Sequence, residues 1–341
     1  MSKKSITISS WNVNCDRRVE LDHGYASKNF AKFKLSHRLS DIVEFFSKHK
    51  TDIVGLCEVD ATYLDDFVTI LTNMNYEVYY GAYAPNQIPN YSYYLIVDYD
   101  PNALEVVEHH MFWFTSTPLE PLTPDTRKVD RFLMEHGESF EKGSLISTFK
   151  KSDGTILIHS MNQYALRNPY KINSSKILAQ HLTTIEEKYA GNEIQMVVCG
   201  DFNTFRTETE PFDSTILQPF LDVGFEPCRD AKAEFTFCAY PYDLGMVKPE
   251  ILKELLEVTG TMSDEKQVRK MFAEKVLELW GRPLTSILNW MLVKNIYASE
   301  CTVETFDMDI EEENLTSIFL EQAKNGKATM LSDHMLLKLK F

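Results

Sequence analysis

The clearest chemical fragment in the sequence is Gly200-Asp201-Phe202-Asn203, which follows a short apolar run over residues 195–199. An Asp and an Asn two positions apart on an extended chain project to the same side. The carboxylate could orient or deprotonate a water molecule, and the amide could donate a hydrogen bond to a developing oxyanion. An Asx turn that merely ends a strand would give the same pattern, so this fragment alone leaves both interpretations open.

Three further fragments end or begin apolar runs with polar residues. Glu58 closes one run, and a single carboxylate in that position suits a hard cation such as Mg²⁺, which keeps several of its waters. Asn12 and Asn14 follow another run, and Asp333-His334 precedes the last one. A histidine beside an aspartate can bind or protonate a phosphate. Taken singly, each fragment could equally be a salt bridge, a turn or a surface histidine.

The elements that must position these residues are buried strands. Short apolar runs predict strands at 6–8, 52–57, 155–158, 195–199 and 335–341. Each run leads into or follows an acid, amide or imidazole side chain, and ligand sites gather at such strand ends. Periodic apolar positions predict amphipathic helices over 35–46 and 172–185, and a helical hairpin over 248–281. No sharp break in composition divides the chain, so we expect one domain over 1–341 with a helical insertion at about 243–283.

Composition narrows the class of protein. The 341 residues are 44% hydrophobic and carry a net charge of −15, which indicates an acidic globular protein rather than a disordered one. The negative charge argues against nonspecific binding to duplex DNA or anionic membranes. We read no secretory signal and no apolar stretch of the ~18 residues that a membrane span needs. The six cysteines form no C-x-x-C pair, so we expect a cytoplasmic location. We also expect a monomer.

In order along the chain, the motifs W-N-x-N, L-x-E, H-x-x-N, G-D-F-N and S-D-H resemble those of the endonuclease/exonuclease/phosphatase superfamily. The resemblance runs from Trp11 to His334, and the ordered set is more specific than any one motif. It implies an α/β (α+β) fold, a four-layer α/β sandwich of two packed mixed β-sheets flanked by helices. It also implies a metal-dependent hydrolase of phosphate esters, either a phosphodiesterase or nuclease, or a phosphatase.

The resemblance assigns the metal ligands by position. Glu58 matches the principal Mg²⁺ ligand, with Asn12 beside it and Asp333 near the metal; Mn²⁺ could replace Mg²⁺. Asn14 stands where abasic-site endonucleases carry an Asp, so a second carboxylate near the metal is missing there. We expect Asn14 to contact the substrate instead.

The same resemblance assigns catalytic roles. Asp201 matches the residue that orients or deprotonates the attacking water, and Asn203 the amide that holds a phosphoryl oxygen. His334 matches the imidazole that binds or protonates the phosphate. Asn289 stands where relatives carry an Asp that orients this imidazole. An Asn can still accept a hydrogen bond from the ring, but it cannot stabilise an imidazolium as a carboxylate does.

One catalytic position has two candidate registers. His159 with Asn162 resembles the histidine motif of pancreatic-type deoxyribonucleases, whereas the more common N-T-H register would put Met161 at the histidine position. We favour His159 because its spacing to Asn162 fits. We therefore expect His159 and Asn162 to take part in catalysis.

The substrate is less well indicated. Arg127, Lys128 and Arg131 form a modest basic group, of which Arg131 could contact a phosphate, although a solvated face would look the same. With no stronger basic cluster, we expect a small or single-stranded phosphate ester rather than duplex DNA. Because of Asn14 and Asn289, the alternative is a degenerate, catalytically weak member that acts as a binding protein.

Overall fold

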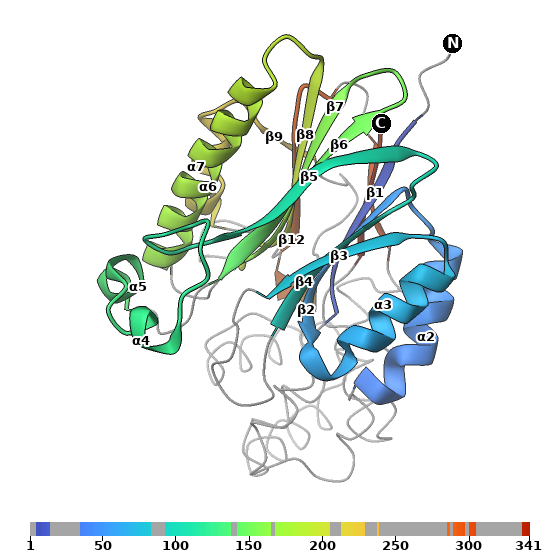
Figure 1. Cartoon of the computed structure of the whole chain (residues 1–341), viewed down its shortest axis with the longest axis horizontal. Helices are drawn as coiled ribbons and strands as arrows, with labels where there is room; N and C mark the ends of the chain where they lie inside the picture. The colour runs from blue at the N-terminus through green and yellow to red at the C-terminus, as the bar shows by residue number, and fades with distance from the viewer. Residues whose placement is uncertain are drawn as a thin grey trace, which may run out of the picture.

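The computed structural model describes eleven stretches of the chain: residues 5–13, 35–82, 93–137, 142–164, 168–204, 213–228, 237–238, 285–286, 289–296, 300–304 and 336–341. Most of the described strands belong to two sheets of six strands each. Figure 1 shows these sheets packed face to face between two layers of helices.

The first sheet has the order β13-β14-β1-β2-β4-β3. Its strands β1 and β2 are parallel, and its other neighbours are antiparallel. The strands are β1 (Thr7–Asn12), β2 (Ile53–Asp60), β3 (Glu77–Ala82), β4 (Tyr93–Tyr99), β13 (Glu300–Glu304) and β14 (Leu336–Lys340).

The second sheet has the order β5-β6-β7-β8-β12-β9. Here β7 and β8 are the parallel pair, and the other neighbours are again antiparallel. The strands are β5 (Leu104–Trp113), β6 (Gly143–Lys151), β7 (Ile156–Gln163), β8 (Ile194–Asp201), β9 (Glu226–Cys228) and β12 (Asn289–Lys294).

Apolar side chains from the inner faces of both sheets form the central core. Ile8 and Leu95 of the first sheet share this cluster with Leu157, Val197 and Met291 of the second. Alternation along each strand sends the neighbouring side chains to the outer faces, where helices cover them. Two sheets and two helical layers thus make up a four-layer sandwich (Figure 1), which is the arrangement that the family resemblance implies.

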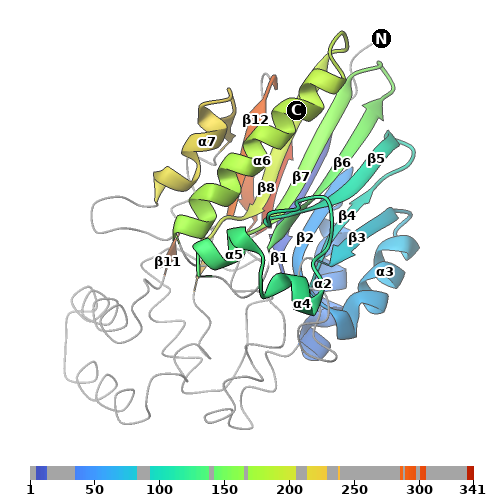
Figure 2. The same cartoon turned by 60° about the vertical axis from the view of Figure 1, so that its left-hand side comes forward.

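The outer layers are helical (Figures 1 and 2). On the first sheet, Trp11 packs against Phe45 and Phe46 of α2 (Leu35–Lys48), beside η2 (Ala61–Tyr63) and α3 (Leu64–Asn73). On the second sheet, Leu178 and Leu182 of α6 (Asn168–Lys188) lie in a second apolar cluster. The remaining helices are α4 (Pro124–Arg127), α5 (Arg131–Glu135), η3 (Ser214–Ile216) and α7 (Gln218–Leu221).

The α/β sandwich with two packed mixed sheets is confirmed, as are helices at 35–46 and 172–185. One predicted strand end is wrong: the run at 155–158 does not stop before His159, because β7 continues to Gln163. The predicted insertion at about 243–283 and the hairpin at 248–281 lie outside the described residues. A two-stranded sheet of β10 (Phe237–Cys238) and β11 (Thr285–Ser286) pairs the stretches on either side of it.

Asp98 of β4 is a buried carboxyl group without a hydrogen-bond partner. It is 0% exposed, and neither of its carboxylate oxygens has a partner. Burial raises the pKa of Asp98 well above its ordinary value of 3.8. The folded protein therefore holds a proton that the unfolded chain releases, so stability is greatest below the ordinary pKa and falls as pH rises towards the raised one.

We predict that Asp98→Asn removes this pH dependence, because the amide carries no charge to desolvate. The free energy of unfolding of the variant, relative to wild type, should grow by up to about 1.4 kcal/mol per pH unit as the pH rises above the ordinary carboxyl pKa towards the raised pKa of Asp98. Urea denaturation at several pH values measures this. Asp125→Asn, at a side chain that is 96% exposed, should show no such trend. Parallel pH curves for wild type and Asp98→Asn would contradict the prediction.

Candidate active site

The ends of the two parallel strand pairs meet at one place in the sandwich. Asn12 ends β1 and Asp201 ends β8, and the Asn12 Nδ2 donates to Asp201 Oδ2 at 3.2 Å. Both side chains are buried, at 0% and 1% exposure. This hydrogen bond joins the first sheet to the second, so residues 189 positions apart in sequence are held within a single site.

Glu58 reaches this site from an irregular position near the end of β2. The pairing of β2 with β4 shifts register between Leu56 and Val59, and Glu58 lies inside that shift with a φ of 58°. A bulge of this kind re-aims a side chain, at the cost of a left-handed conformation that a Glu rarely adopts. Glu58 is partly exposed, whereas the other residues of β2 are buried. Its carboxylate is therefore turned to the edge of the core rather than into it.

Gln163, which the sequence reasoning missed, connects the two carboxylates. It is the last residue of β7, and the parallel pairing of β7 with β8 places it beside Asp201. Its Nε2 donates to Glu58 Oε1 at 3.2 Å and to Asp201 Oδ2 at 3.1 Å. The signal that could have found it is the period of two: with Leu157 and Met161 in the central core, position 163 lies on the same face.

Asn203 lies in the loop directly after β8. Its backbone N–H donates to Asp201 Oδ1 at 2.9 Å, and its Nδ2 donates to the Tyr164 carbonyl at 2.8 Å and to Asp201 Oδ2 at 3.3 Å. The φ of 52° at Asn203 is left-handed, a region that Asn tolerates better than most residues. The buried Lys171 of α6 donates from Nζ to the Asn203 carbonyl at 2.6 Å. Helix and strand together thus fix the turn that carries Asn203.

The structure does not bring His159 to this cluster. His159 is fully buried between the sheets, its Nε2 lies 3.2 Å from the Cys199 Sγ, and burial lowers the pKa of the imidazole to about 3. It precedes Gln163 by four strand positions, which is about 13 Å of extended chain. Met161, the other candidate, also packs against Cys199. His159 lies away from Glu58 and Asp201 because β7 continues beyond it, so the strand end falls at Gln163.

Asn162 faces the other side of β7. Its Nδ2 donates to the backbone carbonyls of Cys199 and Ser160, at 2.7 and 3.1 Å. The Asn162 amide nitrogen therefore bonds to the backbone of β7 and β8, and neither of these two hydrogen bonds involves Glu58 or Asp201.

Asn289 lies beside Asp201. The antiparallel pairing of β12 with β8 sets these two residues directly opposite each other, and Asn289 is 1% exposed. Opposite residues present their side chains on the same face of a sheet. Asn289 is therefore next to the site, although its expected partner His334 lies outside the described residues, as do Asn14 and Asp333.

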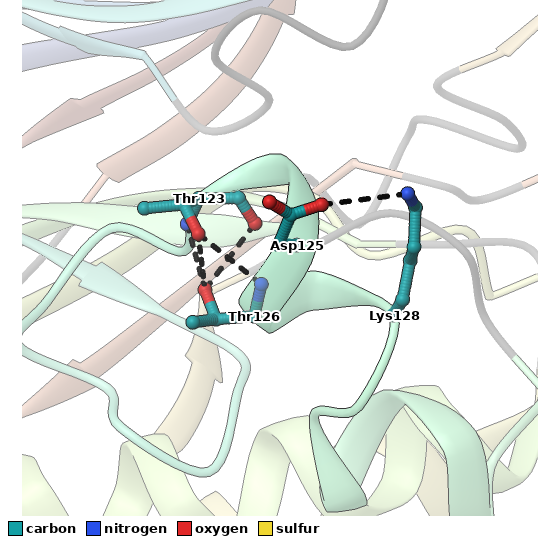
Figure 3. Close-up of polar contacts among 4 residues, drawn as sticks. All are labelled: Thr123, Asp125, Thr126 and Lys128. Carbon is teal, nitrogen blue, oxygen red and sulfur yellow. Dashed lines mark hydrogen bonds and ion pairs between the residues drawn. The ribbon is translucent and has the colours of Figure 1, made fainter.

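The basic group after β5 is engaged mainly in its own local structure. Figure 3 shows the N-terminus of α4, where Thr123 and Thr126 form a capping box and Lys128 pairs with Asp125 at 3.5 Å. Arg127 is buried, whereas Arg131 is exposed on α5. Within the described stretches, no hydrogen bond or ion pair joins Arg131 to Glu58 or Asp201.

The described residues suit a hard cation, even though they include no group of three or more His, Cys, Asp or Glu side chains with metal-binding geometry. Glu58 and Asp201 are close enough to share one amide nitrogen, and the side-chain amide of Asn12 lies beside Asp201. Mg²⁺ binds to oxygen, often through one or two carboxylates, and keeps several waters. Two carboxylates and an amide are thus a fitting donor set.

The sequence comparison identifies the class of protein to which this sandwich belongs. The model of the endonuclease/exonuclease/phosphatase family matches residues 9–245, which is more than half of the chain. The chain belongs to this family, whose members are hydrolases of phosphate esters. No curated protein matches it in sequence.

Solved structures show the same fold at low identity. An endonuclease/exonuclease/phosphatase from Bacteroides vulgatus is 14% identical, with 99% of this chain and 98% of that one covered and a TM-score of 0.59. The mannosyl-6-phosphatase of Bacteroides thetaiotaomicron is 14% identical, with 98% of each chain covered and a TM-score of 0.55. ANGEL2, a 2',3'-cyclic phosphatase, is 11% identical, with 100% and 96% covered and a TM-score of 0.64. At these identities the likeness concerns the fold alone.

Gly200 allows β7 and β8 to approach closely next to Asp201. Its φ is +128°, and a Cβ added there would lie 2.2 Å from the Asn162 carbonyl oxygen. We predict that Gly200→Ala lowers the free energy of unfolding by more than about 2 kcal/mol, because backbone strain and a backbone clash add together. Gly191→Ala is the matched control, since Gly191 has a φ of +100° but open space around it. Urea denaturation measures both values. An equal loss of unfolding free energy in the two variants would show that the close approach at Gly200 does not contribute to the effect.

Proposed function

We propose that the protein is a Mg²⁺-dependent hydrolase of phosphate esters, with Mn²⁺ as a substitute cation. The observation that carries this proposal is the joining of Glu58 and Asp201 through Gln163 at the meeting point of the two sheets. Glu58, with Asn12 beside it and Asp333 expected nearby, would hold the cation. When bound, the cation would offset negative charge on the phosphoryl oxygens.

Asp201 is suited to orient the attacking water. The side-chain amides of Asn12, Gln163 and Asn203 and the backbone N–H of Asn203 all donate to its carboxylate, which fixes its position. In the proposed reaction the water oxygen bonds to phosphorus and releases a proton to Asp201, the ester P–O bond breaks, and the leaving oxygen receives a proton. We assign that proton to His334, and a hydrogen bond to a phosphoryl oxygen to Asn203.

The neutral side chain of Asn289 favours slower catalysis than a carboxylate at this position would allow. It occupies the strand position opposite Asp201, next to the site, and a neutral amide there cannot stabilise an imidazolium as a carboxylate would. A member that binds phosphate esters but turns them over slowly is therefore the second candidate. In both cases we assign Asn14 and Arg131 to substrate contacts.

For the substrate we propose a small or single-stranded phosphate ester. The net charge of −15 disfavours capture of a long duplex, and Lys128 is already paired with Asp125. We propose a location in the cytoplasm, since the six cysteines of the sequence are scattered without a C-x-x-C pair, and we propose that the protein is a monomer. Within the described residues, no helix is long and apolar enough to cross a membrane.

We predict that the protein hydrolyses bis(p-nitrophenyl) phosphate or p-nitrophenyl phosphate with Mg²⁺ and not after chelation. Asp201→Asn and Glu58→Gln should each lower turnover at least about 100-fold, because the water loses its orienting group or the cation loses its ligand. Asp125→Asn, on the exposed surface, is the control and should match wild type. Absorbance of released p-nitrophenolate measures the rate.

Unchanged turnover in Asp201→Asn would contradict the assignment of the site. No turnover with Mg²⁺, Mn²⁺ or Ca²⁺ would favour the binding protein instead. A panel of abasic-site DNA, single-stranded RNA, a phosphoinositide, sphingomyelin, a sugar phosphate and a 2',3'-cyclic phosphate would then define the substrate. The last two correspond to the activities named for two structural neighbours.

A further inference from the structure

Gln163 holds the two carboxylates of the site with one end of its amide. It is 2% exposed, and its Nε2 lies 3.2 Å from Glu58 Oε1 and 3.1 Å from Asp201 Oδ2. Only an N–H donor can face two carboxylate oxygens at these distances, so the orientation of the amide follows from its neighbours. This end of the side chain is therefore satisfied.

The other end of the amide is not satisfied. Gln163 Oε1 is buried and has no hydrogen-bond partner. Buried acceptors nearly always have a donor, and leaving one without is costly. The oxygen belongs to an amide that two hydrogen bonds fix beside Glu58 and Asp201, so it is held close to both carboxylates.

A hydrated divalent cation supplies such a donor. Mg²⁺ keeps several of its waters when it binds to protein carboxylates, and each water can donate hydrogen bonds. Groups that hold metal ligands in place commonly strengthen metal binding although they do not touch the metal. A glutamine offers a donor on one side and an acceptor on the other at any pH, since its amide does not titrate.

We infer that Gln163 is a positioning residue for the divalent cation. Its Nε2 keeps Glu58 and Asp201 in place, and its Oε1 accepts a hydrogen bond from a water in the hydration shell of the cation. This inference rests on the proposed function, and it adds a residue that none of the sequence motifs contains.

Cation binding without substrate tests the inference. The dissociation constant for Mn²⁺ is measured by electron paramagnetic resonance of the free ion, and that for Mg²⁺ by competition. Gln163→Met keeps the length of the side chain but removes donor and acceptor, and it should raise the dissociation constant at least about tenfold. Gln195→Met is the control: Gln195 is partly exposed and accepts a hydrogen bond from Lys151, and it lies near the other end of β8. It should stay within about twofold of wild type.

Glu58→Gln tests whether the cation site exists, separately from whether Gln163 supports it. If wild type binds Mn²⁺ and Glu58→Gln does not, the proposed cation site stands, and the Gln163 variant alone decides the inference. Unchanged or tighter binding of Mn²⁺ by Gln163→Met would then overturn the inference. Unchanged binding would mean that the amide does not affect cation affinity, and tighter binding would mean that the amide competes with the cation for the carboxylates. If wild type binds no cation, the proposed function fails and the inference fails with it. Should Gln163→Met not fold, Gln163→Asn replaces it, because its amide is one methylene too short to reach both carboxylates.

Discussion

The site depends on the parallel pairing at the centre of each sheet. In an otherwise antiparallel sandwich, β1 runs parallel to β2 and β7 runs parallel to β8. Parallel neighbours end at the same edge, so each pair delivers two strand ends together. Packing of the sheets then brings the two edges into contact, and the hydrogen bond from Asn12 to Asp201 crosses between them. If either pair were antiparallel, one of its strand ends would lie at the far edge.

Local strain refines what the pairing provides. Glu58 and Asn203 both have positive φ values, and Gly200 does so where a side chain would meet the backbone of Asn162. Such conformations persist only where the surrounding structure enforces them. The enforcing contacts here are the bulge in β2 and the hydrogen bonds from Lys171 and to Tyr164. Among the described residues, Glu58 and Asn203 are thus two of the four non-glycine residues with positive φ; the other two, Asn75 and Asn295, are not part of the cluster.

The sequence predicts the fold and the strand ends better than it predicts the side chains between them. Apolar runs and ordered motifs single out Asn12, Glu58, Asp201 and Asn203, which the structure places in one cluster with Gln163. The same reasoning predicts that β7 ends before His159, because a polar residue after three apolar ones is typical of a strand end. The strand continues since both faces of β7 are buried, and the resulting core tolerates His159 as a neutral ring. Neither the bulge at Glu58 nor the partners of Gln163 could be predicted, because both depend on pairing between distant strands.

The charge of the site differs from the charge of the whole protein. Within the described cluster, Glu58 and Asp201 are the carboxylates, and the groups that contact them include the neutral amides of Asn12, Gln163 and Asn203. One divalent cation would balance those two charges, so the occupied site would not add to the repulsion of an incoming phosphate. The net charge of −15 then repels anions over the rest of the surface, and salt in the solvent screens this repulsion. A short ester that enters the site escapes most of this repulsion, whereas a long polyanion lying across the surface does not.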